Sequence, residues 1–234
     1  MRRKWLIPVI VIAVMTASVA AYAGNYYHAD PSALTALVSD ETVHVTETDY
    51  GWFFDGPSEG DAMVFYPGAK IETISYAPLL HLLAGQGMDV CLVEMPLRLA
   101  FLGMGKAGPV MDQYEYNHWY VGGHSLGGAM AAVYAAEHGE QLTGLILLAA
   151  YPTKELDDAL LEISIYGSED LVLSREKVLA GKEYAPPDFC ELVIEGGNHA
   201  QFGNYGYQKG DGIAAISCEE QQRITVDFII SNMK

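Results

Sequence analysis

The stretch Trp119-Tyr-Val-Gly-Gly-His-Ser-Leu-Gly-Gly128 decides the fold of this 234-residue chain. An apolar run ends at Val121, a Gly-x-Ser-x-Gly turn follows, and the small residues after it predict a helix. This strand–turn–helix context is typical of a nucleophile elbow, which presents a serine hydroxyl on a tight turn. The turn requires glycine two residues before and two residues after Ser125, here Gly123 and Gly127. The hydroxyl then stands at a helix N-terminus, where the helix dipole favours developing negative charge.

The pentapeptide alone also fits a glycine-rich turn whose serine has no catalytic role. Whether Ser125 is a nucleophile therefore depends on whether the chain supplies a base and an acid to act with it. A nucleophilic serine needs a base to take its proton and an acid to orient that base. Downstream, the apolar run 161–166 is followed by Gly-Ser-Glu-Asp170, and the run 192–194 by Glu-Gly-Gly-Asn-His199. Both candidates lie just past a strand end, where the catalytic groups of open α/β sheets gather.

The order of these residues along the chain selects the acid and the base. Asp170 stands three residues past the glycine that ends its strand, whereas the competing acids Asp157 and Asp158 precede that strand and Glu169 is one residue closer. His199 is the only histidine that follows Asp170. We therefore predict Ser125 as nucleophile, His199 as base and Asp170 as the acid that orients it, in the chain order serine, acid, histidine.

An oxyanion hole should complete this site. One donor is expected to be the backbone N–H of Leu126, the residue after the nucleophile, and the other that of Ala69, in the loop after an early apolar strand. Gly68 in that loop allows a substrate to approach the backbone closely. We also place Lys70 and His124 at the substrate. The ammonium of Lys70 either reaches a substrate carboxylate or phosphate or stays solvated in its loop.

Six segments of the chain resemble the small, exported or membrane-anchored bacterial serine hydrolases of the α/β-hydrolase superfamily. This resemblance implies an α/β-hydrolase fold, with a mostly parallel central sheet and helices on both faces, and a Ser–Asp–His triad. A glycine-rich loop, 202–212, either shapes the pocket, binds an ion through Asp211 or is a plain surface loop. The segments that carry the resemblance are Tyr66-Pro-Gly-Ala-Lys70, Glu94-Met-Pro96, Gly122-Gly-His-Ser-Leu-Gly-Gly128, Leu147-Leu-Ala-Ala-Tyr-Pro152, Tyr166-Gly-Ser-Glu-Asp170 and Gly196-Gly-Asn-His-Ala-Gln-Phe-Gly203.

The pattern of apolar runs agrees with a single α/β domain over residues 41–234. The first strands, near 42–48, 52–54 and 62–66, have no helices between them, which predicts antiparallel pairing there. The later alternation of strands and helices predicts a parallel sheet. About a dozen residues separate the strand that ends near 149 from the strand that begins at 161, so no large cap domain is expected.

The N-terminus predicts the compartment. Arg2, Arg3 and Lys4 precede the uncharged apolar stretch 5–23, which ends in Ala-Tyr-Ala. Residues 1–23 are therefore either a cleaved signal peptide or a membrane anchor, and 24–40 a stalk or a first helix. Both alternatives predict an extracytoplasmic domain, anchored or secreted, because the basic residues stay inside.

Charge and chemistry narrow the partners. With 30 acidic and 13 basic residues, the net charge of −17 disfavours nucleic acid as a partner. We expect a carboxylic ester hydrolase that acts on a small-molecule ester or related acyl substrate through an acyl-enzyme, with neither a metal nor an organic cofactor. The alternative is a non-catalytic binding or surface protein on the same scaffold. The oligomeric state is left open.

Overall fold

One eight-stranded sheet organises the part of the chain that the structure describes, residues 6–57 and 60–233 of a computed structural model. The strands lie in the order β1-β2-β4-β3-β5-β6-β7-β8. Their bounds are β1 His44–Thr48, β2 Gly51–Asp55, β3 Asp61–Tyr66, β4 Asp89–Val93, β5 His118–His124, β6 Gly144–Leu148, β7 Leu161–Gly167 and β8 Asp188–Ile194.

The sheet is antiparallel at one side and parallel elsewhere, as predicted for the strands near 42–48 and 52–54 and for the later strands. The prediction was wrong for the strand near 62–66, because β4 lies between β2 and β3 and β3 pairs in parallel with β4 and β5. Strand β2 pairs antiparallel with both β1 and β4, because only a tight turn joins β1 to β2. The pairs from β4 through β3, β5, β6 and β7 to β8 are all parallel. All the parallel strands therefore end at the same edge of the sheet, which we call the carboxyl edge.

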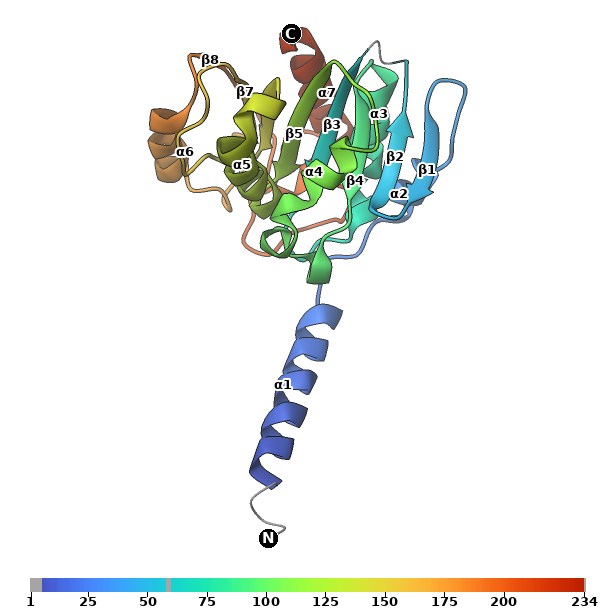
Figure 1. Cartoon of the computed structure of the whole chain (residues 1–234), viewed down its shortest axis with the longest axis vertical. Helices are drawn as coiled ribbons and strands as arrows, with labels where there is room; N and C mark the ends of the chain where they lie inside the picture. Colours follow the sequence, from blue (N-terminus) through green and yellow to red (C-terminus); the bar gives the residue numbers. More distant parts are fainter. Residues whose placement is uncertain (1–5, 58–59, 234) are drawn as a thin grey trace.

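Helices cover both faces of this sheet, with α5 in front of it and α7 behind it (Figure 1). Alternate residues of β3 explain the two layers: Met63 and Phe65 pack with α3 and α7, whereas Val64 packs with α4 and α5. The α/β-hydrolase fold class is thus confirmed. The helices are α1 Leu6–Gly24, α2 Pro31–Thr35, α3 Ala77–Gly85, α4 Ala107–Met111, α5 Leu126–His138, α6 Arg175–Gly181 and α7 Cys218–Asn232.

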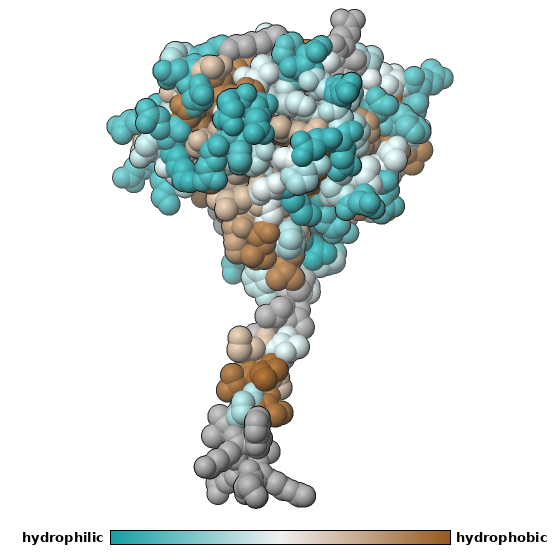
Figure 2. All heavy atoms as spheres, in the orientation of Figure 1, coloured by the Kyte–Doolittle hydropathy of each residue, from teal (hydrophilic) through white to brown (hydrophobic). Residues whose placement is uncertain are grey.

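Helix α1 projects away from the globular body (Figure 1), and apolar side chains stand on its surface (Figure 2). The basic residues 2–4 lie outside the described residues. Within the described part of the chain, no helix has both the length and the apolar character that crossing a membrane requires.

The segment after α1 packs on the body. Tyr27 forms a parallel bridge with Ile71, the N–H of Asp30 donates to the carbonyl of Asn204 at 2.8 Å, and Ala33 is fully buried in α2. The sequence predicted a stalk or a first helix for residues 24–40. The structure ends α1 at Gly24 and forms the short helix α2 after it, and the contacts of this segment tie the base of α1 to the carboxyl edge.

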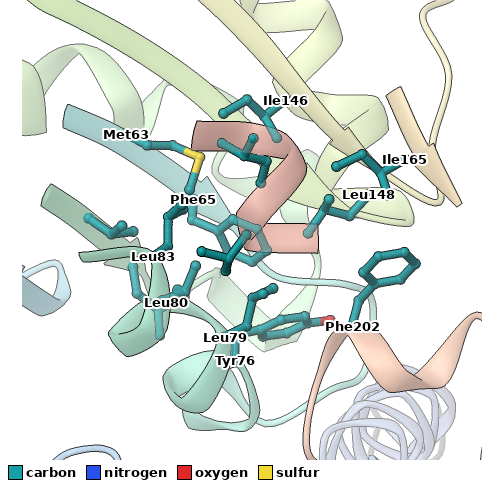
Figure 3. Packing of buried hydrophobic residues seen from close by; sticks show 14 of the residues in the cluster. Met63, Phe65, Tyr76, Leu79, Leu80, Leu83, Ile146, Leu148, Ile165 and Phe202 are labelled. Atoms are coloured by element: carbon teal, nitrogen blue, oxygen red, sulfur yellow. The ribbon is translucent and has the colours of Figure 1, made fainter. Parts of the chain in front are cut away.

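A layer of large apolar side chains supports the site from behind. Leu79, Leu80 and Leu83 of α3 lie against Met63 and Phe65 of β3 (Figure 3). These side chains are at most 1% exposed, and each fully buried one stabilises the fold by about 1.5–3 kcal/mol. The rigid sheet that results fixes the starting point of every loop at the carboxyl edge.

Candidate active site

Ser125 occupies the sharp turn between β5 and α5 that the sequence predicted. Its backbone has φ 53° and ψ −123°, a conformation that residues other than glycine seldom adopt. The turn is held at both ends, because the Ser125 N–H donates to the Leu148 carbonyl at 2.9 Å and the Ser125 carbonyl accepts from the Ala129 N–H at 2.9 Å. The surrounding sheet and helix thus impose a strained backbone on this serine.

Close packing explains the two glycines of the turn. A Cβ atom on Gly127 would lie 2.1 Å from the carbonyl oxygen of Tyr66 and 2.4 Å from that of Pro67. A Cβ atom on Gly123 would lie 2.5 Å from the same Tyr66 oxygen. Both contacts are to backbone, which cannot rotate away, so only hydrogen fits at these positions.

Asp170 and His199 meet across the loops that follow β7 and β8. His199 Nδ1 lies 2.8 Å from Asp170 Oδ2, and both side chains are almost fully buried. The other carboxylate oxygen, Oδ1, accepts the N–H groups of Val172 at 2.9 Å and Leu173 at 2.7 Å. With Nδ1–H donated to the acid, Nε2 of His199 carries the lone pair and is the basic nitrogen.

Ser125 and His199 line the same cavity at the carboxyl edge. Its volume is about 280 Å³, and Nε2 of His199 is buried with no hydrogen-bond partner among the described residues. Proton transfer from a serine hydroxyl requires an acceptor nitrogen of this kind. Further lining residues are Leu126, Ala129, Ala149, Tyr151, Val172, Leu173 and Lys177.

The elbow is also joined to the loop after β3. The buried Tyr76 hydroxyl accepts the N–H of Gly68 at 3.0 Å and lies 2.8 Å from Nδ1 of His124. The His124 ring packs on the His199 ring with centroids 4.5 Å apart. Burial, together with the neighbouring His199, holds the pKa of His124 well below its ordinary value, so this imidazole is neutral.

The residues expected to bind the oxyanion and the substrate lie in three different places. Leu126 lines the cavity, and Ala69 lies in a loop that is fixed on both sides, since the N–H of Gly68 donates to Tyr76 and that of Lys70 to the Arg98 carbonyl at 2.9 Å. Lys70 places its ammonium 4.8 Å from the centre of the Tyr22 ring, at the base of α1.

His124, which the sequence placed at the substrate, is fully buried. Its ring therefore acts on the site through Tyr76 and His199 and offers a substrate no surface of its own.

Asp211, in the glycine-rich loop 202–212, is a residue of the site whose link to the histidine loop the sequence did not predict. Its Oδ2 accepts the N–H of Ala200 at 2.9 Å, and its Oδ1 accepts those of Gly212 at 2.8 Å and His199 at 3.3 Å. The side chain is buried, and these three bonds join it to the backbone of the histidine loop. The carboxylate of Asp211 therefore holds the backbone of the histidine loop in place.

Comparison of the sequence with known protein families identifies the relatives of this chain. The profile described as "Alpha/beta hydrolase family" matches residues 62–223, a range that holds Ser125, Asp170, His199 and Asp211. The chain belongs to the alpha/beta hydrolase family. No curated protein sequence matches it.

Solved structures of other proteins share this fold at low sequence identity. Est1E from Butyrivibrio proteoclasticus is 14% identical with a TM-score of 0.56, covering 82% of this chain and 99% of its own. A monoacylglycerol lipase of Paleococcus ferrophilus is 15% identical with a TM-score of 0.60, covering 81% and 99%. A hyperthermophilic esterase of Pyrobaculum calidifontis is 14% identical with a TM-score of 0.58, covering 86% and 88%.

Proposed function

We propose that this alpha/beta hydrolase is a serine ester hydrolase that works through Ser125, His199 and Asp170. The observation that carries the proposal is the buried Asp170–His199 pair, whose histidine lines the same cavity as Ser125. Solved structures with the same fold are named as esterases and a lipase, which supports an ester as substrate.

The proposed reaction proceeds in two steps. His199 Nε2 takes the hydroxyl proton of Ser125, Oγ attacks the ester carbonyl, and the imidazolium then protonates the leaving alcohol. Water attacks the acyl-enzyme with His199 again acting as base, and the acid and Ser125 are released. The N–H of Leu126, and that of Ala69 in the loop fixed by Tyr76, are the proposed donors to the oxyanion.

The buried carboxylate of Asp170 gives the base its direction. Two backbone N–H groups compensate its charge from behind, which leaves Oδ2 for the imidazole. This arrangement holds one tautomer of His199 and stabilises the imidazolium that forms during each step.

A fluorophosphonate probe and a short-chain nitrophenyl ester test the proposal together. The wild-type protein should be labelled and should hydrolyse the ester, and Ser125→Ala should lose both properties while keeping its thermal unfolding temperature. Ser231→Ala, at an exposed position on α7, is the matched control and should behave as wild type. A folded wild-type protein that neither reacts with the probe nor turns over esters would favour the alternative, a non-catalytic binding protein.

We also propose an extracytoplasmic location, with the N-terminal segment as an export signal or an anchor. Three basic residues at 2–4 precede the apolar helix α1, as in secretory leaders. Cell fractionation followed by N-terminal mass determination tests this location. A protein found in the cytosol with Met1 at its start would contradict it.

A further inference from the structure

The loops around the site opening carry large apolar side chains that face solvent. They follow β4, β7 and β8 at the carboxyl edge, and their residues are between 36% and 87% exposed. Single exposed apolar residues are common on soluble surfaces, whereas several of them at one edge of a sheet indicate a binding surface. We call this set the rim: Leu97, Phe101, Leu102, Met104, Leu171, Val172, Tyr207 and Ile213.

The connections at the opposite edge of the sheet expose fewer large apolar side chains. Among the described residues of its connections (36–43, 56–57, 60, 86–88, 112–117, 139–143, 157–160 and 182–187), the exposed large apolar side chains are Val38, at 66%, and Tyr184, at 39%. The loops of the carboxyl edge thus carry more exposed large apolar side chains, the eight of the rim, than the connections of the opposite edge.

Helix α1 leaves the body from this same edge. The N–H of Tyr27 donates to the Lys70 carbonyl at 2.7 Å, in the loop after β3, and Arg98 stacks on Tyr26 at 3.5 Å from its ring centre. Figure 2 shows apolar surface low on the body, next to the point where α1 emerges. Apolar side chains along α1, from Val9 to Met15, are 50% or more exposed. Rim and helix therefore form one apolar pole, with tyrosine–cation pairs at their junction.

The rim is continuous with the cavity. Val172 is 39% exposed and also lines the cavity beside Ser125, and its neighbour Leu173 lies deeper in the same wall. An apolar acyl chain moving from the rim to the nucleophile would therefore stay in contact with apolar side chains.

We propose that the rim docks on a neutral lipid surface and that the substrate is an acyl ester drawn from that surface; this rests on the proposed ester hydrolase function. The apolar side chains come from separate loops at the carboxyl edge, which suits a fluid surface. A partner protein docked on these side chains would cover the cavity. Tyrosine and cationic side chains at the junction with α1 are typical of the level where lipid meets water. The net charge of −17 favours zwitterionic over anionic lipid.

Flotation with phosphatidylcholine vesicles tests the docking surface in the full chain. Leu102→Ser removes a rim side chain that is 47% exposed, and Leu82→Ser on α3 removes a matched one that is 43% exposed and lies away from the rim. Partitioning onto vesicles should fall about fivefold in Leu102→Ser and remain near wild type in Leu82→Ser, because membrane affinity follows the apolar area buried. Vesicles that also contain phosphatidylglycerol should bind the wild-type protein less well.

The activity arm separates this inference from the function beneath it. The ratio of turnover on a long-chain ester in vesicles to turnover on a soluble short-chain ester should fall about fivefold in Leu102→Ser alone. Equal flotation of the two variants, or concentration-dependent dimers that Leu102→Ser disrupts, would overturn the lipid surface. Vesicle binding by a protein that hydrolyses neither ester would instead overturn the ester hydrolase and leave the surface standing.

Discussion

The two halves of the site are held in place by different forces. The elbow at Ser125 is shaped by contact: a strand, a helix and the loop after β3 approach so closely that glycine is the largest residue that fits at 123 and 127. The half that carries Asp170 and His199 is held by hydrogen bonds that loop backbone N–H groups donate to buried carboxylates. The difference teaches that one half should fail through sterics and the other through lost polar partners.

Gly127→Ala is the strongest way to break the elbow. The added Cβ meets two backbone oxygens at 2.1 and 2.4 Å, so strand and helix must separate. We expect a loss of about 4 kcal/mol in the free energy of unfolding, measured by chemical denaturation, which is above the usual cost of overpacking. Gly105→Ala is the control, because nothing lies within 4 Å of a Cβ there. Similar losses in the two variants would contradict the steric account.

The strand that delivers Asp170 carries a buried acid, which makes this half sensitive to pH. Glu162 on β7 is 1% exposed, its Oε2 has no hydrogen-bond partner among the described residues, and burial raises its pKa to about 7. Below the ordinary pKa of 4.5 the group is protonated in both states. Between that value and about 7 only the unfolded chain ionises, so stability falls as pH rises.

Glu162→Gln should remove this penalty. At pH 8 the variant should be more stable than wild type by on the order of 2 kcal/mol in chemical denaturation, and the difference should disappear near pH 4. Glu155→Gln, at an exposed position before β7, is the control and should show no such gain. A difference independent of pH would show that packing, not ionisation, separates the two proteins.

Asp211→Asn is the finer test of the polar half. The amide replaces one oxygen that accepts backbone N–H groups of the histidine loop, so the loop should shift while the sheet stays intact. We expect kcat on a soluble ester to fall about tenfold with KM nearly unchanged, since only the position of His199 is affected. Asp158→Asn, at an exposed site, is the control. An effect on KM alone would assign Asp211 to substrate binding instead.

The same contrast explains what could be predicted from the sequence. The elbow was evident because its strand, its two glycines and its helix are neighbours in the chain, and Asp170 and His199 followed from their places after apolar runs. Tyr76 and Asp211 were missed as partners because their contacts, to His124 and to the histidine loop, join residues 48 and 12 positions apart. The contact between Lys70 and Tyr22 could not be predicted either, because no local pattern reveals that the chain before α2 brings Tyr22 beside Lys70.

The connection between β6 and β7 spans twelve residues, from Ala149 to Leu160, too few for a separate folding unit above the opening. Product departure therefore requires no movement of a lid in this connection, so a lid-opening step should not limit turnover. Exposed positions 153–155 in the middle of that connection offer a place where a grafted helical lid could be added without disturbing the strands.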